Sequence, residues 1–287
     1  MKQHTLGWIN GFIGVAIFSG TLPATRVAVQ QLPPLFVTSA RACIAALLGG
    51  LLLCLLKQTR PHAAQLRSLI LVSMGVVLGF PLFTSLALQH ASSAHMIVFV
   101  GLLPLSTALF AVWRGGERPK PLFWAFALVG AISVASYALL NSDGAPWYSD
   151  VLMLAAIVVC GMGYAEGAKL SRELGGWQVI SWALLLSLPV ILPLALWSWP
   201  SPIAPVHSNA WWSLAYVSVF SMLIGFVFWY QGLAQGGTAA VGQLQLLQPF
   251  MGLGLAALLL QEHIHPSMLV VTVVAVLCVA GAKRFAH

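Results

Sequence analysis

The chain is a series of long apolar runs separated by short polar turns, and this alternation restricts its fold more than any other feature. A transmembrane helix needs about 20 consecutive apolar residues. The turns contain clusters of turn-forming residues, among them QQLPP, QTRPH, QHASSAH, RGGERPKP, NSDGAPW and SPIAPVHSN. We therefore predict ten spans, at 7–29, 33–56, 66–89, 92–113, 121–140, 149–168, 177–198, 210–233, 239–260 and 266–284. The weakest boundary is QGGTAAVG at 235–242, which carries no charge.

The composition excludes a soluble protein with a single membrane anchor. Of the 287 residues, 60% are hydrophobic and only 7% are charged, and the mean hydropathy is +0.92. Soluble domains are about 45–50% apolar and about 25% charged. The first apolar stretch continues to Val29, so we expect it to be retained as a span and not cleaved as a signal peptide. The fold class is thus an all-α integral membrane protein.

The positive charges indicate which ends of the spans face the cytoplasm. The net charge is +7, but the cations stand singly between apolar runs, which argues against a nucleic-acid surface. Cytoplasmic turns carry an excess of Lys and Arg. With the N-terminus inside, 11 of the 13 cations fall in inner turns: Lys2, Lys57, Arg60, Arg67, Arg114, Arg118, Lys120, Lys169, Arg172, Lys283 and Arg284. This pattern predicts that both termini are cytoplasmic.

The sequence repeats itself weakly at a spacing of 145 residues. This shift places Pro104 on Pro249, Glu117 on Glu262, and Ser93-Ala94 on Thr238-Ala239. We interpret the chain as two five-span halves, 1–141 and 148–287. Because five is odd, the second half enters the membrane upside down. Inverted repeats are typical of secondary transporters, whose substrate site lies near the midplane between the repeats.

This pattern resembles the drug/metabolite transporter superfamily, and specifically its EamA-type ten-span permeases. The paired segments that carry the resemblance are SSAHMIVFVGLLPLSTALFAVWRGGE and GTAAVGQLQLLQPFMGLGLAALLLQE, together with FSGTLPATRVAV and PPLFVTSARA near the start. Each paired segment has a small-residue start, a mid-span proline and a closing glutamate. The resemblance covers the whole chain. It implies a carrier that moves amino acids, other metabolites or toxic compounds, usually outward.

Two prolines lie at equivalent places in spans four and nine. Proline lacks an amide hydrogen and leaves the carbonyl four residues earlier without its helical donor. For Pro104 and Pro249 these carbonyls belong to Val100 and Gln245. Such groups are tolerated at membrane depth where protein or a water-filled cavity satisfies them. We predict that Pro104 and Pro249 act as gating hinges, the alternative being plain packing kinks.

Three polar side chains lie deep in predicted spans. Gln245 and Gln248 share one helical face, and either line a cavity or act as hydrogen-bonding contacts between helices. Arg41 lies about eight residues into span two and can hold a substrate carboxylate through two hydrogen bonds. Its alternative role is pairing with a backbone carbonyl or an internal acid. Arg26 lies nearer the outer end of span one and can extend its charge to the interface.

Glu166 is the acid that the sequence places within a span and the candidate for proton coupling. Burial raises the pKa of a carboxyl group and allows it to carry a proton. The alternative is a surface ion pair with Lys169, three residues later. The chain has only six acids, so uncoupled facilitated diffusion stays open.

Deep aromatic residues and one hydroxyl complete the predicted site. Small-molecule sites are mostly apolar with a few polar anchors. The predicted substrate-binding set is Ser19, Arg41, Phe80, Phe83, Phe99, Tyr164, Trp229, Gln245 and Gln248. Each aromatic residue alone is more often helix packing than a pocket wall.

The remaining chemistry-bearing residues indicate neither a cofactor nor a metal. His90, His95, His263 and His265 flank outer turns and are interpreted as solvated. The cysteines lie in apolar runs and are interpreted as small core residues. A GxxxxGK[ST] motif, the signature of ATP hydrolysis, is missing.

The function that these features favour is a secondary transporter and not an enzyme. We predict an exporter of small amphipathic metabolites such as amino acids, located in a bacterial inner membrane and working by alternating access. The alternatives are efflux of drugs or toxic compounds, and a facilitative, channel-like permease. A membrane enzyme would need clustered catalytic groups, and a channel would need a ring of like polar groups along its pore. The sequence shows neither pattern. The expected partners are a small-molecule substrate and membrane lipid, without nucleic acid, and a monomer is the working expectation.

Overall fold

The computed structural model describes residues 2–115, 120–140, 145–200, 206–236 and 241–285, and these residues contain helices and no strands. The all-α prediction is confirmed for this part of the chain. The α-helices are α1 (Lys2–Ser19), α2 (Thr21–Val29), α3 (Pro34–Leu55), α4 (Ala63–Val72), α5 (Phe80–His90), α6 (Ser93–Val100), α7 (Leu103–Gly115), α8 (Pro121–Leu140), α9 (Trp147–Leu174), α10 (Gly176–Trp197), α11 (Ser208–Ala215), α12 (Gly225–Gly236), α14 (Gln248–Leu260) and α15 (Pro266–Arg284). Three further segments are η1 (Ser73–Gly79) and η2 (Tyr216–Ile224), which are π-helical, and η3 (Gly242–Leu247), which is a 3₁₀-helix.

Several helical segments are long and apolar enough to cross a membrane. Within the described residues seven meet this requirement: Thr5–Val29, Pro34–Leu55, Ala63–His90, Ser93–Trp113, Trp147–Leu174, Gly176–Trp197 and Ser208–Gly236. Three shorter apolar helices lie at Pro121–Val134, Leu244–Leu260 and Pro266–Cys278. The three shorter helices coincide with predicted spans five, nine and ten. The chain is thus a multi-pass membrane protein, whereas the ten-span count stays a prediction.

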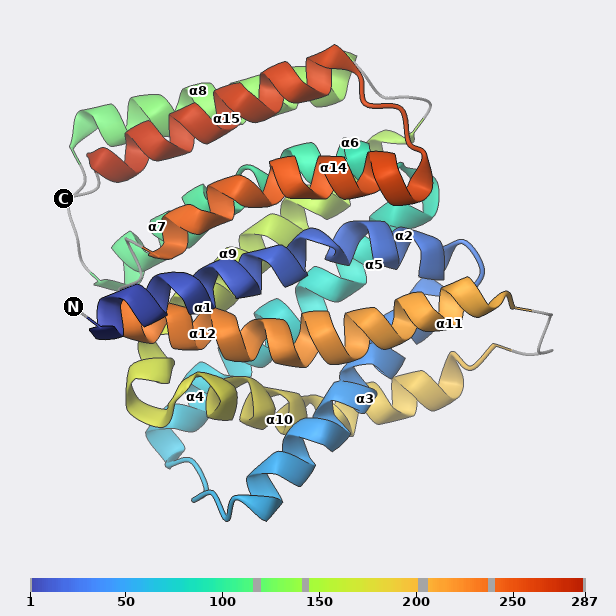
Figure 1. Ribbon diagram of the computed structural model, residues 1–287, viewed down its shortest axis with the longest axis vertical. Coiled ribbons are helices and arrows are strands. Elements are labelled where there is room, and N and C mark those ends of the chain that lie inside the picture. The colour runs from blue at the N-terminus through green and yellow to red at the C-terminus, as the bar shows by residue number, and fades with distance from the viewer. Residues whose placement is uncertain (1, 116–119, 141–144, 201–205, 237–240, 286–287) are drawn as a thin grey trace.

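Helices from the first 141 residues pack mainly against helices from the rest of the chain. Figure 1 shows α8 beside α15 at the top of the view and α1 beside α12 near the middle. In the same way α3 packs against α10, and α9 packs against α4, η1, α5 and α7. One large hydrophobic core therefore contains side chains from both parts of the chain. Figure 1 also places the N-terminus and the C-terminus at the same end of the bundle.

Glycines allow α1 and α12 to lie in direct backbone contact. A Cβ atom on Gly7 would lie 2.5 Å from the backbone nitrogen of Gly236, and one on Gly232 would lie 2.6 Å from that of Gly11. Small residues spaced four apart are how membrane helices approach closely, because lipid provides no hydrophobic drive for their association. This contact fixes α1 against α12 and so positions the residues that follow at the end of α1.

Helix irregularities recur at the spacing of the sequence repeat. Adding 145 to the bounds of η1 gives 218–224, which lies inside η2. Adding 145 to Leu103, the first residue of α7, gives Gln248, the first residue of α14. Pro104 and Pro249 are therefore the second residues of new helices and do not lie inside continuous ones. The Gln245 carbonyl, predicted to lack its donor, accepts a hydrogen bond from the backbone N–H of Gln248.

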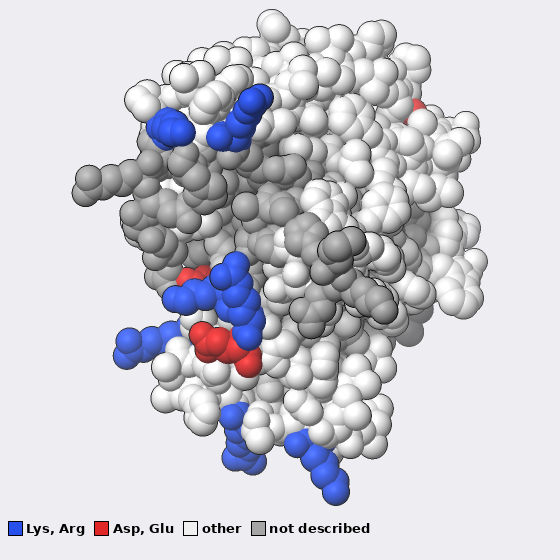
Figure 2. All heavy atoms as spheres, turned by 60° about the vertical axis from the view of Figure 1, so that its left-hand side comes forward, with Lys and Arg blue, Asp and Glu red and all other residues white. Residues whose placement is uncertain are grey.

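Charged side chains gather at the end of the bundle that carries the termini. Figure 2, which turns this end toward the viewer, shows Lys and Arg side chains over it. Exposed cations lie where α3, α9 and α15 end and where α4 and α8 begin: Lys57, Arg60, Arg67, Lys120, Lys169, Arg172 and Arg284. Glu117, Arg118, Thr238 and Ala239 lie outside the described residues. The charge distribution agrees with a cytoplasmic location for this end, which remains a prediction.

Candidate substrate site

The first predicted span is interrupted at Gly20, between α1 and α2. The backbone N–H of Gly20 donates to the Ile17 carbonyl at 3.3 Å, and the Tyr216 hydroxyl donates to the same carbonyl at 2.7 Å. A Cβ atom on residue 20 would lie 2.5 Å from the Tyr216 oxygen. Glycine is therefore required here for close approach, and Tyr216 satisfies a carbonyl that the interruption leaves partly unpaired.

A buried arginine lies beside this interruption. Arg41, on α3, is 2% exposed, and its Nη2 atom donates to the Ser221 hydroxyl at 3.2 Å. Ser221, in the π-helix η2, also pairs with the Thr21 hydroxyl at 2.8 Å. The Nε and Nη1 atoms of Arg41 have no hydrogen-bond partner among the described residues, and no carboxylate contacts the guanidinium there. A buried cation with two free donors is suited to an anionic group, which guanidinium binds through parallel hydrogen bonds.

Four aromatic rings pack together next to the end of α1. Phe18 lies between Tyr164, Phe226 and Trp229, with ring centroids 4.9 Å from Phe226 and 6.4 Å from each of the other two. The Tyr164 and Trp229 rings are 5.8 Å apart. The Trp229 Nε1 atom is buried without a partner among the described residues. Two of the predicted aromatic site residues are thus in contact, through elements α9 and α12.

An apolar cavity borders the interruption at Gly20. It has a volume of about 480 Å³ and lies between α2, α11, η2 and α14. Its walls include Gly20, Tyr216, Trp212 and Leu255. Tyr216 and Ser221 are five residues apart on η2, which is the spacing that a π-helical hydrogen bond connects. The cavity wall and the polar contact of Arg41 are therefore built from neighbouring turns of the same element.

The other predicted substrate residues occupy different places. Gln245 and Gln248 are 2% and 7% exposed, on η3 and α14, which pack against α1. Their Nε2 and Oε1 atoms, respectively, have no partner among the described residues. The Ser19 hydroxyl donates to the Val15 carbonyl of its own helix at 2.8 Å. Phe80 and Phe83 are half-buried on α5, and Phe99 lies on α6. Ser221 connects Arg41 to Thr21 through hydrogen bonds. Neither glutamine forms a hydrogen bond to this group among the contacts of the described residues.

Glu166 is buried, at 3% exposure, while Lys169 is exposed. The surface position considered for Glu166 is therefore wrong, because α9 turns this residue toward its neighbouring helices. Its role in proton coupling stays a prediction.

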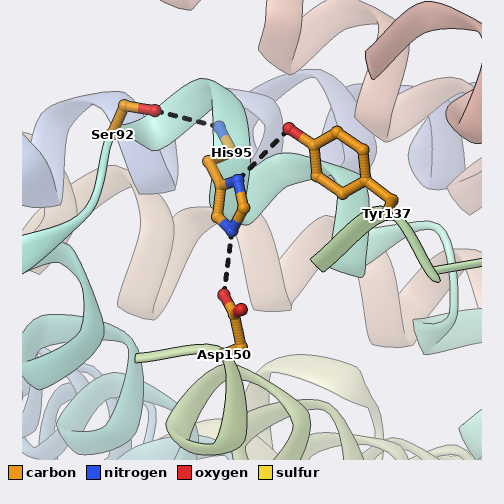
Figure 3. Close-up of polar contacts among 4 residues, drawn as sticks. All are labelled: Ser92, His95, Tyr137 and Asp150. Carbon is orange, nitrogen blue, oxygen red and sulfur yellow. Dashed lines mark hydrogen bonds and ion pairs between the residues drawn. The ribbon is translucent and has the colours of Figure 1, made fainter. Parts of the chain in front are cut away.

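His95 is the clearest departure from the sequence interpretation. It was expected to be solvated, yet it is 0% exposed, because it lies in the first turn of α6 and faces two other helices. Figure 3 shows its ring between Tyr137 of α8 and Asp150 of α9. The Nδ1 atom lies 3.2 Å from the Tyr137 hydroxyl and the Nε2 atom 2.8 Å from the Asp150 carboxylate. The Ser92 hydroxyl accepts a hydrogen bond from the backbone N–H of His95.

A second carboxylate binds the same helix end. Glu262 accepts from the backbone N–H groups of Ser93 and Ala94 at 3.0 and 2.7 Å, and from the Ser93 hydroxyl at 2.8 Å. A carboxylate at a helix N-terminus satisfies free N–H groups and complements the helix dipole. Arg26 donates to the carbonyls of Leu88 and Gln89 at the end of α5. The extension of its charge to the membrane interface stays a prediction.

The sequence analysis did not identify three residues that contact Arg41 or His95, namely Ser221, Tyr137 and Asp150. Ser221 lies in an apolar run, and its counterpart at a spacing of 145 residues is Val76, so the repeat gives no signal. Tyr137 and Asp150 are far from His95 in the chain, and only the packing of α6 against α9 and the position of α8 bring them together. The described cysteines are all free, and Cys54 is exposed, contrary to the expected core position. Among the described residues no three His, Cys, Asp or Glu side chains form a group suited to a metal ion.

Comparison with known proteins gives consistent results. An uncharacterized transporter, YdeK, of Bacillus subtilis (strain 168) is 60% identical over 286 residues, covering 100% of both chains. A second uncharacterized transporter of that organism, YvbV, is 21% identical and is matched over 92% of this chain and 88% of its own length. An uncharacterized transporter of Archaeoglobus fulgidus is 20% identical over 236 residues, with 81% of this chain and 82% of the relative covered.

A solved structure shares the fold. A crystal structure described only as that of a protein matches 99% of this chain and 98% of its own with a TM-score of 0.69, at 20% sequence identity. The model of the EamA-like transporter family matches this chain twice, at residues 5–139 and 147–282. Since these two matches cover nearly the whole sequence, the chain belongs to the EamA-like transporter family of the drug/metabolite transporter superfamily.

Proposed function

We propose that this transporter exports small amphipathic metabolites that carry a carboxylate, such as aromatic or branched amino acids, across a bacterial inner membrane. The observation that carries the proposal is Arg41, a buried cation with two donor atoms that have no partner among the described residues. Its partner Ser221 lies on η2, which also lines the apolar cavity through Tyr216. An anionic group placed against Arg41 and Ser221 would satisfy these donors. The apolar part of the same molecule would fit the cavity or the Phe18 aromatic group. Membrane depth strengthens this pairing, because water competes weakly there.

The mechanism that we propose is alternating access by two inverted halves, 1–141 and 148–287. Three observations support it: the double match of one family model, the helix irregularities 145 residues apart, and the packing of each half mainly against the other. Inverted repeats carry the substrate near the midplane and expose it alternately by rocking. The helix starts at Pro104 and Pro249 would provide the points of bending.

Counterflow in proteoliposomes tests the substrate class. Vesicles with purified protein and unlabelled L-phenylalanine or L-leucine inside would be offered the labelled compound outside. We expect saturable uptake by the natural protein, loss of uptake in Arg41→Ala, and partial retention in Arg41→Lys, which keeps the charge without the planar donors. Arg67→Ala is the matched control, because Arg67 is exposed on α4. Uptake by Arg41→Ala equal to that of the natural protein would remove Arg41 from the site.

The same vesicles separate the proposal from its alternatives. Labelled apolar cations such as ethidium represent the toxic compounds of the efflux alternative. Transport of ethidium without transport of either amino acid would overturn the carboxylate proposal, because a buried Arg41 repels a cation. Gln245→Ala is expected to impair uptake as well while leaving membrane insertion intact, since its amide lies buried without a partner among the described residues.

A further inference from the structure

We infer that His95 and Asp150 form a latch that holds the two parts of the chain together at the end of the bundle opposite the termini (Figure 1). The inference rests on the proposed transport function for its consequence, but the latch itself can be tested without a substrate. It is separate from Glu166, which lies in the second half of α9, whereas Asp150 lies in the first turn of that helix.

The latch is a charge-assisted hydrogen bond formed by a buried ring. His95 is 0% exposed and the Asp150 side chain 15%, and their Nε2 and Oδ1 atoms are 2.8 Å apart. Tyr137 contacts the other ring nitrogen. A neutral ring satisfies both contacts if Nε2–H donates to Asp150 and Nδ1 accepts from the Tyr137 hydroxyl. Hydrogen bonds to an ionised carboxylate are about twice as strong as neutral ones.

This contact joins the two parts of the chain at one helix end. His95 belongs to the first part and Asp150 to the second (Figure 3). Two residues before His95, Ser93 is bound by Glu262, which also belongs to the second part. The first turn of α6 is therefore held by α9 on one side and by the segment after α14 on the other. Opening of this end requires both contacts to part.

The two contacts that hold the first turn of α6 differ in their number of donors. Glu262 is held by three donors, whereas the Asp150 carboxylate accepts its hydrogen bond from the His95 ring. Replacing Asp150 with asparagine keeps an acceptor oxygen but removes the charge, so the bond from His95 loses its charge assistance. Asp150→Asn is thus a small change that weakens the contact between the two parts.

A polar cavity of about 410 Å³ adjoins the latch and includes His95. The titratable and charged groups around it come from all the elements that meet here. They are Arg26 of α2, His90 of α5, Tyr137 of α8, Tyr148 and Asp150 of α9, and Glu262, His263 and His265 after α14. His90 shares the cavity but is exposed, so it provides the control position.

Hydrogen exchange of the full-length protein in lipid nanodiscs tests the latch directly. At one pH near 7.5, loss of one charged hydrogen bond should make the amides of 93–100 exchange about ten- to hundredfold faster in Asp150→Asn and His95→Gln. His90→Gln should exchange like the natural protein. Amides of α10 should be unchanged in every variant, which confirms that the variants are folded. Equal protection of 93–100 in the natural protein and Asp150→Asn would overturn the latch.

Transport tests the consequence. In counterflow of labelled L-phenylalanine, the natural protein and Asp150→Asn should both exchange substrate. Counterflow should be faster in Asp150→Asn and His95→Gln and should keep the natural rate in His90→Gln, because only the first two substitutions weaken the latch. If Asp150→Asn exchanges substrate at the natural rate, the latch does not control the opening of this end although the transport function stands. Absence of counterflow in the natural protein would instead count against the proposed substrate, and the exchange result would still decide the latch.

Discussion

Ser221 is the residue that connects the buried cation to the interruption of the first span. Its hydroxyl contacts both Arg41 and Thr21, which lie on different helices. We expect Ser221→Ala to lower kcat/KM for counterflow about tenfold, which corresponds to one lost hydrogen bond to a charged group. Ser218→Ala is the matched control on η2, because the Ser218 hydroxyl donates to the carbonyl of Leu214 at the end of the preceding helix α11 and not to Arg41 or Thr21. If both variants lower transport equally, the effect belongs to η2 as a whole and not to the Arg41 contact.

At this scale the sequence predicted single residues better than their contacts. The depth of Arg41 follows from its distance from the turn at the start of its span, and the structure confirms that Arg41 is buried. Its partner Ser221 stands 180 residues away, and no local pattern joins the two. His95 shows the opposite failure, because its nearness to a turn suggested exposure. The packing of α6 against α9, which a local pattern cannot reveal, buries it.

The contact between α1 and α12 depends on glycine at the element scale. Gly232 lies where its missing side chain lets the two backbones touch. Overpacking of a close contact costs about 1–3 kcal/mol. We therefore expect Gly232→Val to lower the apparent melting temperature of the purified protein, measured by size-exclusion chromatography after heating. Gly254→Val should leave it unchanged, since nothing lies within 4 Å of a Cβ atom at Gly254. If both variants have the melting temperature of the natural protein, the contact between α1 and α12 accepts a larger side chain without loss of stability.

The helix starts at Pro104 and Pro249 are a second property of elements. Proline at the beginning of a helix stops the helix from extending backward, because it has no N–H to donate. In Pro249→Ala, the new N–H can donate to the Gln245 carbonyl, so α14 can extend into η3. We expect slower counterflow with unchanged insertion into the membrane. Pro266→Ala is the control, because Pro266 starts α15 after a non-helical segment. Counterflow at the natural rate in Pro249→Ala would contradict the hinge role.

The whole molecule was the most predictable level, for a physical reason. Apolar runs of membrane length must form helices, since lipid leaves no other way to satisfy a single segment's backbone. The repeat then indicated where irregularities recur, as the starts of α7 and α14 confirm. The repeat gives no signal for the interruption at Gly20, because the equivalent position, residue 165, lies inside the continuous α9. Asymmetry between the halves is set by packing, which a repeat cannot reveal.

The number of spans has a consequence for the whole molecule that one experiment decides. An even number places both termini on the same side of the membrane, and an odd number places them on opposite sides. The seven long segments alone would separate the termini, whereas these seven and the three shorter helices together would not. Figure 1 places both termini at one end of the bundle, and Figure 2 shows cations there. We expect green fluorescent protein to fluoresce when fused to either end of the full chain in bacterial cells, and alkaline phosphatase fused there to be inactive. Active phosphatase at the C-terminus with a fluorescent N-terminal fusion would establish an odd count. The two halves could then not be inverted copies of five spans each, and alternating access by inverted repeats would be the wrong mechanism.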